Sequence, residues 1–234
     1  KTRYTQIWAF NHEGKELWTT HLPGGFHTAH QPVPIDLDHD GRDEVMAGYA
    51  LLNADGTTRW VYQSRSVDQN RGHCDCFRLI RAGKSPAEAR FTMTFCGANN
   101  LAVLDGNGKP IWEFAGHHFE SVDVGKFRAD VPGLQLAVDI DHRPKGEGPV
   151  WVFDETGRPV GQIMTGYARH HALLDWTGDG LDEIVVADAR GLFDGQGRRV
   201  ATLAMAESER EGEGEPAEML ALVRAHGDGG VLGR

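Results

Sequence analysis

Short apolar runs recur along the chain, and each one ends at an Asn or Asp that is followed three positions later by Gly. Runs of this length favour β-strands, and the Asn/Asp-x-x-Gly spacing is typical of a hairpin turn between two antiparallel strands. A Trp stands four positions after the Gly in the first three copies. The five predicted turns are Asn11–Gly14, Asn53–Gly56, Asp105–Gly108, Asp154–Gly157 and Asp194–Gly197.

Successive turns are separated by 42, 52, 49 and 40 residues. A period of this size that contains several strands is typical of β-propeller blades. We therefore predict an all-β fold: a partial β-propeller of about five four-stranded antiparallel repeats. Because known propellers mostly have more blades, we interpret residues 1–234 as one propeller region from a larger ring. Segment 85–90 has the composition of one helical turn, but its place in the repeat favours a loop.

Two acidic segments lie between the predicted hairpins. Each alternates oxygen-bearing side chains, has Gly at its sixth position, ends in Glu and is flanked by apolar strands. Calcium takes about six to eight oxygen ligands, so both segments predict a Ca²⁺ loop, although the flanking strands distinguish them from an EF-hand. The alternative is a solvated turn without an ion, which fits the second copy better. The predicted ligands are Asp36, Asp38, Asp40, Arg42 and Glu44 in the first loop and Asp175, Thr177, Asp179, Leu181 and Glu183 in the second.

Composition narrows the possible partners. Charged residues make up 25% and hydrophobic residues 40% of the chain, which is ordinary for a globular protein. The net charge of −10 argues against a general nucleic-acid binder. No apolar run approaches the roughly 20 residues of a transmembrane helix, so no membrane partner is expected. Three cysteines do not give a disulfide framework. We also expect the protein to be a monomer.

A candidate site follows from the strand register. In a propeller, the segments that lead into the innermost strands gather at one end of the axis. We align these segments on Asp36, Arg81, Lys126 and Asp175, the first positions of the acidic or degenerate loops. Positions eight and six before these anchors share one face of a strand. The residues expected to converge there are His30, His73, Asp75, His118, Glu120, Tyr167 and Arg169. The alternative is a polar ring that satisfies backbone groups near the channel.

The segment Gly72–Cys76 also carries zinc-type ligands. With Cys96 or His117 it could complete a zinc site, although the spacing is not that of a zinc finger. A strand period of two turns Cys74 and Cys76 away from His73. Buried free cysteines are the alternative, and they are commoner.

These motifs together resemble the β-propeller polysaccharide lyases, most closely the family 11 rhamnogalacturonan lyases and secondly the ulvan lyases. The resemblance rests on the acidic loops, the Asn/Asp-x-x-Gly-x-x-x-Trp hairpins, the Gly-His-x-Asp of 72–75 and the segment 132–135. It implies a calcium-bearing propeller that cleaves an anionic, uronic-acid polysaccharide by β-elimination in an extracellular or periplasmic location. The rhamnogalacturonan enzymes have Gly where Cys74 stands, and their chains are longer.

The resemblance also suggests roles for the converging residues. Arg169 suits neutralisation of the substrate carboxylate, His73 or His118 suits the base, and Tyr167 suits the acid. His30, Asp75 and Glu120 are expected to bind substrate. The alternative function is a non-catalytic, calcium-stiffened propeller, like the integrin-type repeat proteins, that binds glycan or protein. A quinoprotein dehydrogenase is a third possibility, which the acidic loops disfavour.

Overall fold

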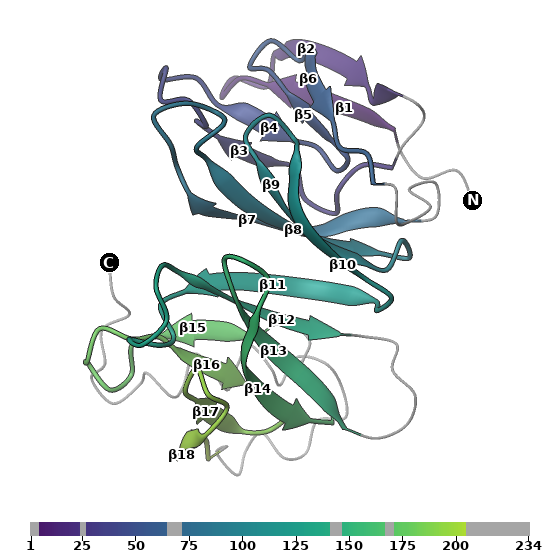
Figure 1. The fold of residues 1–234 in the computed structure, drawn as a ribbon. Coiled ribbons are helices and arrows are strands. Elements are labelled where there is room, and N and C mark those ends of the chain that lie inside the picture. Colours follow the sequence, from purple (N-terminus) through teal and green to yellow (C-terminus); the bar gives the residue numbers. More distant parts are fainter. Residues whose placement is uncertain (1–4, 24–26, 65–71, 141–146, 167–170, 205–234) are drawn as a thin grey trace.

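The computed structural model describes residues 5–23, 27–64, 72–140, 147–166 and 171–204. These residues form antiparallel sheets joined by turns and loops (Figure 1). No helix in this part of the chain is long and apolar enough to cross a membrane. The predicted all-β class is confirmed, and in segment 85–90 a bend and a turn over residues 85–88 lead into the strand that begins at Arg90, with no helix.

Four sheets of four strands follow one another along the chain, after a two-stranded ribbon of β1 (Gln6–Phe10) and β2 (Glu16–His21). The first has β3 (Val33–Ile35), β4 (Glu44–Met46), β5 (Ala50–Leu52) and β6 (Thr58–Val61). The second has β7 (His73–Arg81), β8 (Arg90–Cys96), β9 (Asn100–Asp105) and β10 (Pro110–Ala115). The third has β11 (Phe119–Gly125), β12 (Gln135–Ile140), β13 (Gly148–Asp154) and β14 (Pro159–Thr165). The fourth has β15 (Ala172–Leu174), β16 (Glu183–Val186), β17 (Gly191–Phe193) and β18 (Arg199–Thr202).

Each four-stranded sheet is a meander in which every strand pairs with the next one in sequence. An acidic or degenerate loop joins its first two strands, and an Asn/Asp-x-x-Gly turn joins its last two, as predicted. The expectation of about five four-stranded repeats needs one correction. Among the described residues, the first repeat has two strands, because β1 and β2 are the hairpin around Asn11 without an acidic-loop hairpin beside it.

The Asn/Asp-x-x-Gly turns share one geometry. In four of them the Asn or Asp side-chain oxygen accepts hydrogen bonds from the backbone N–H groups two and four residues later; at Asp105 these bonds are 2.9 and 3.0 Å long. The glycine has positive φ, +77° at Gly108, which L-residues rarely adopt. The strand register shifts beside each turn, so a bulge accompanies every hairpin.

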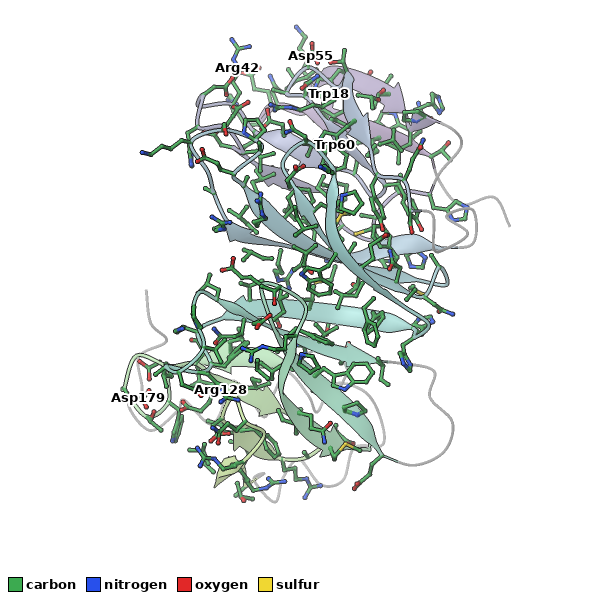
Figure 2. The ribbon with its side chains drawn as sticks, in the orientation of Figure 1. Trp18, Arg42, Asp55, Trp60, Arg128 and Asp179 are labelled. Carbon is green, nitrogen blue, oxygen red and sulfur yellow. The ribbon has the colours of Figure 1, made fainter. Side chains whose placement is uncertain are left out.

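The tryptophan of each of the first three hairpins packs on the turn of the next repeat. Indole Nε1 of Trp60 donates to the carbonyl of Gly106 at 2.9 Å, and Trp18 and Trp112 make the same bond to Ala54 and Glu155. Trp18 and Trp60 are labelled in Figure 2. The ring lies so close that a Cβ added to Gly108 would meet Trp60 at 2.5 Å. The Trp that recurs four positions after the Gly therefore couples neighbouring repeats.

The hydrophobic core is divided among the spaces between successive sheets. One cluster joins Met46 and Tyr49 to Phe91 and Phe95 of the second sheet, and a second joins Leu101 to Leu136 of the third. Further clusters lie between the third and fourth sheets and between the ribbon and the first sheet. Each sheet is thus buried on its neighbours, and β11 lies against both β7 and β15.

Candidate functional site

The two acidic loops fold by the same hydrogen bonds. In the first, the Asp36 carboxylate accepts from the backbone N–H groups of Asp40 and Gly41, both at 3.1 Å. Glu44 accepts from the N–H of Leu37 at 3.1 Å. In the second loop, Asp175 accepts from the N–H groups of Asp179 and Gly180, and Glu183 accepts from Trp176. The repeat recognised in the sequence is therefore also a repeat of local structure.

The first loop has a donor set that fits calcium. Asp36, Asp38 and Asp40 offer carboxylate oxygens that all lie within 4.8 Å of one another. A guanidinium group that the sequence did not point to also contacts this loop: Arg59 of β6 lies 2.8 Å from Asp38 and 2.9 Å from Glu44. In the second loop, the Thr177 hydroxyl donates to Glu183 at 3.1 Å, so one carboxylate fewer is available there.

The third four-stranded sheet has an ammonium group inside the equivalent loop, which joins β11 to β12. Lys126 Nζ donates to the carbonyls of Val131 and Gly133 at 2.5 and 2.9 Å. Gln135 pairs with Gly125 as Glu44 pairs with Ile35, and its Oε1 accepts from the N–H of Phe127 at 2.9 Å. A neutral amide thus stands where the first acidic loop has a carboxylate, and the lysine ammonium cross-links this loop.

The register of the second sheet differs from the prediction by one residue. Arg81 pairs with Arg90, just as Ile35 pairs with Glu44, so the loop begins at Ala82 rather than at Arg81. A bulge between Leu79 and Arg81 absorbs the extra residue. The predicted equivalence of His73 with His118 therefore survives.

A cleft of about 440 Å³ lies where the predicted segments meet. It is lined by His30, Gln31, Asp75, Cys76, Arg78, Glu120 and Ser121. These residues come from the segment before β3, from β7 and from β11, so three successive repeats build it. The backbone N–H of His30 donates to the carbonyl of Cys74 at 3.1 Å and holds the first segment against β7.

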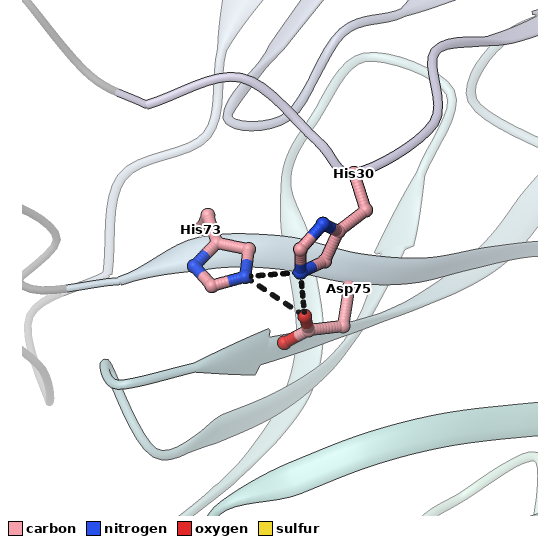
Figure 3. Close-up of side chains that lie close together, drawn as sticks. All are labelled: His30, His73 and Asp75. Atoms are coloured by element: carbon pink, nitrogen blue, oxygen red, sulfur yellow. Dashed lines mark hydrogen bonds and ion pairs between the residues drawn. The ribbon is translucent and has the colours of Figure 1, made fainter. Parts of the chain in front are cut away.

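His30, His73 and Asp75 form a compact cluster beside this cleft (Figure 3). The two Nε2 atoms are 2.7 Å apart, and Asp75 Oδ1 lies 3.0 Å from His73 Nε2 and 3.2 Å from His30 Nε2. The other carboxylate oxygen, Oδ2, accepts from the backbone N–H of Cys96 at 2.7 Å. The His30 side chain is 61% exposed, whereas that of Asp75 is 4% exposed. The cluster is therefore fixed from within and open on one side.

The next repeat supplies a second imidazole–carboxylate pair at the same register. His118 Nε2 lies 3.3 Å from Glu120 Oε2, and His118 Nδ1 lies 4.0 Å from Cys96 Sγ. His118 and Glu120 thus repeat, one sheet later, the arrangement of His73 and Asp75.

Of the predicted site residues, the structure brings together His30, His73 and Asp75 in one cluster and His118 and Glu120 in another. Tyr167 and Arg169 lie outside the described residues.

Three side chains in or next to the cleft were not predicted from the sequence: Arg78 lines it, and His171 and Asp139 contact Ser121, which lines it. Arg78 lines the cleft and contacts Asp123 at 2.9 Å through Nε. His171 is buried, with Nδ1 3.4 Å from the Ser121 hydroxyl. Asp139 accepts from the N–H of Ser121 at 2.7 Å, and burial raises its pKa to about 6. Arg78 stands three residues after Asp75, so the period of two gave no signal for it.

The cysteines do not form the zinc arrangement considered above. Cys74 and Cys76 are buried, and burial raises the pKa of both thiols. The bulge between Cys74 and Cys76 places Cys76 on the cleft beside Asp75, which corrects the expectation that it faces the other way. His117 packs against Phe114 and Trp151 instead of a cysteine.

No protein-family model and no curated protein sequence matches this chain. Solved structures do match it. The rhamnogalacturonan lyase YesW has 16% identity and a TM-score of 0.50 over 81% of this chain and 35% of its own. The exotype rhamnogalacturonan lyase YesX has 16% identity and a TM-score of 0.52 over 83% of this chain and 38% of its own. The Vibrio cholerae biofilm matrix protein Bap1 has 12% identity and a TM-score of 0.57 over 82% of this chain and 57% of its own.

The chain thus spans about a third of the length of the two lyases. At this level of identity the likeness concerns the fold alone. The structure shares its all-β, sheet-after-sheet fold with two rhamnogalacturonan lyases and with a biofilm matrix protein.

Proposed function

We propose that this chain is part of a β-propeller polysaccharide lyase that cleaves a uronic-acid polysaccharide by β-elimination. The observation that carries the proposal is the cleft, which three successive repeats line with His30, Asp75, Arg78 and Glu120. His73 and His118 contact its two carboxylates. A concave site with a few convergent titratable groups is the usual form of an active site. The similar fold of two rhamnogalacturonan lyases supports it.

The reaction makes three demands on the protein. A base removes the proton from the carbon that bears the carboxylate. The electron pair of that C–H bond forms a double bond to the neighbouring carbon, whose bond to the glycosidic oxygen breaks. An acid gives a proton to the departing oxygen, and a positive group beside the carboxylate makes the first proton acidic.

The geometry favours His118 as the base over His73. His73 is buried, and its Nε2 contacts both His30 and Asp75. His118 lies outside the cluster of His30, His73 and Asp75, and it contacts Glu120, which lines the cleft, so its imidazole is the more suitable base. Arg78 is the described cation that lines the cleft, and its planar guanidinium suits a uronate carboxylate. Tyr167 stays the expected acid.

We further propose that the stacked sheets are blades of one propeller region that belongs to a larger ring. The coverage of about a third of each lyase supports this. Calcium, held by the residues predicted in the two acidic loops, would stiffen the hairpins that lead to the cleft. An anionic polysaccharide is too large to enter a cell intact, so we place the activity outside the cytoplasm.

A non-catalytic propeller that binds a glycan or a protein is the second candidate. It is supported by the likeness to the biofilm matrix protein Bap1, which has the higher TM-score of 0.57. In that case the same cleft would bind its ligand without changing it.

Ultraviolet absorbance distinguishes the two functions, because elimination leaves a double bond conjugated with the carboxylate. We would test pectic, ulvan-type and other uronate polysaccharides with calcium-loaded protein. We expect a rise on one substrate class, and His118→Ala should slow it by about a hundredfold or more, since a general base contributes at least that much.

His12→Ala is the matched control, because His12 is an exposed histidine in the turn after β1, and it should leave the rate unchanged. Circular dichroism would check that the His118→Ala protein is folded. If folded protein raises the ultraviolet absorbance with none of the substrates, the lyase function is wrong and the non-catalytic binding function is favoured.

A further inference from the structure

The triangle formed by His30 Nε2, His73 Nε2 and Asp75 Oδ1 has sides of 2.7, 3.0 and 3.2 Å (Figure 3). From this geometry, we propose that these three side chains bind one divalent first-row transition-metal ion, with zinc as the reference. The segment before β3 supplies one ligand, and β7 supplies the other two.

Hydrogen bonding alone does not account well for this triangle. Each neutral imidazole offers either an N–H or a lone pair at Nε2, and one N–H points at one acceptor. If both Nε2 atoms carry a proton, the two N–H groups repel each other at 2.7 Å. If only one does, that N–H can donate to the other imidazole or to Asp75, but not to both. Asp75 Oδ1 is buried and accepts no hydrogen bond of ordinary geometry among the described residues. A cation between the three atoms would satisfy all three lone pairs at once.

The dimensions of the triangle match a coordination sphere. Zinc bonds to imidazole nitrogen and carboxylate oxygen are about 2.0–2.1 Å long. Neighbouring ligand atoms are then about 3.0 Å apart in an octahedral arrangement and about 3.3 Å apart in a tetrahedral one. The observed sides therefore need only small movements to close on an ion.

The donor types select the metal. Two imidazoles and one carboxylate suit zinc, cobalt, nickel or iron, whereas calcium prefers oxygen ligands throughout. This site is thus chemically distinct from the acidic loops, whose donors are oxygens. The hydrogen bond from Cys96 N–H to Asp75 Oδ2 is the kind of outer contact that orients a metal-bound carboxylate.

The arrangement leaves coordination positions directed to the cleft. His30 and Asp75 both line the cleft, and the His30 side chain is 61% exposed. Three protein ligands plus an open position are typical of catalytic rather than structural metal sites. If the chain is the proposed lyase, a metal ion here would add positive charge beside the substrate carboxylate, and His118, which is not one of the three ligands, would act as the base. That role rests on the proposed function, whereas metal binding does not.

Cobalt(II) is the probe, because its visible spectrum reports both binding and ligand type. The full chain would be stripped of metal, saturated with calcium to fill the acidic loops, and titrated with Co²⁺. We expect one tightly bound ion with visible bands, no thiolate-to-cobalt band in the near ultraviolet, and displacement by Zn²⁺. His30→Ala, which changes an exposed side chain, should weaken the affinity at least tenfold, whereas His12→Ala should not.

Three outcomes would overturn the proposal: no stoichiometric Co²⁺ binding, equal affinity in His30→Ala and His12→Ala, or a thiolate band that is lost in Cys96→Ser. The last outcome would place the ion at Cys96, His118 and Glu120, which also lie within 4.8 Å of one another. Because binding is measured without polysaccharide, a metal site without elimination would contradict the lyase alone. Elimination by metal-free protein that His30→Ala leaves unchanged would contradict the metal role in catalysis.

Discussion

At the scale of single residues, the cleft combines two histidine–carboxylate pairs, each two residues apart in sequence, with Arg78, whose guanidinium contacts Asp123 of the next sheet. The alternation of His73 with Asp75 and of His118 with Glu120 was visible, because each pair lies two positions apart on one strand. The contact of Arg59 with the first acidic loop and that of Arg78 with the cleft depend on how strands distant in sequence pack, so no local pattern predicts them.

Asp139 illustrates how one position can differ between repeats. Its carboxylate accepts the N–H of Ser121 at the bulge of β11, and Thr94 accepts the N–H of Cys76 at the corresponding bulge of β7. Burial raises the pKa of Asp139 from 3.8 to about 6. The folded state therefore favours the protonated form more than the unfolded state does. The resulting stability is fully present below about pH 4 and is lost as the pH rises through about 6.

Asp139→Asn should make the free energy of unfolding less dependent on pH in this range. The amide keeps an acceptor for Ser121 but cannot ionise. We expect the free energy of unfolding of the variant to exceed that of the parent by on the order of 2 kcal/mol at pH 8, and the difference to vanish near pH 4. Urea unfolding at several pH values measures the difference. A variant that is no more stable than the parent at pH 8 would show that the buried charge costs little.

At the scale of elements, the strand order and the turns could be predicted from the sequence, because each Asn/Asp-x-x-Gly turn makes its hydrogen bonds locally. The bulges could not be predicted. They insert a residue in β7 at Cys74–Cys76 and again at Leu79–Arg81, which moves Arg81 out of the loop and turns Cys76 to the cleft. Bulges depend on partner strands, so spacing along one strand does not reveal them.

Gly108→Ala tests the coupling between repeats, with Gly14→Ala as its control. Both glycines have φ of +77°, so both variants lose about 1 kcal/mol from the left-handed backbone. A Cβ at Gly108 also meets Trp60 at 2.5 Å, whereas at Gly14 nothing lies within 4 Å. We expect Gly108→Ala to lose about 1–3 kcal/mol more than the control. Equal losses in thermal unfolding would show that the indole contact contributes nothing.

Calcium should stabilise the first acidic loop and not the loop that contains Lys126. Asp40 and Asp130 are the fifth residues of these two loops and form a matched pair. We expect calcium to raise the unfolding temperature of the parent and of Asp130→Asn alike, and to raise that of Asp40→Asn by less, because stabilisation follows the affinity of the folded site. A calcium effect that is the same in all three proteins, or absent from the parent, would contradict the calcium loop.

At the scale of the whole molecule, the hydrophobic clusters lie between neighbouring sheets and no single centre joins them. The period of 40 to 52 residues predicted such repeating units, because each one buries its faces on the next. The cleft forms only when the repeats pack together, because three successive repeats supply its residues.

The most direct test of β-elimination is the mass of the oligosaccharides released from the substrate on which the protein raises the ultraviolet absorbance. Elimination leaves each new non-reducing end lighter by one water than hydrolysis would. We predict unsaturated ends from the parent protein and from His12→Ala, and none above background from His118→Ala. Saturated ends would contradict β-elimination, and an unchanged polymer with folded, calcium-loaded protein would contradict catalysis itself.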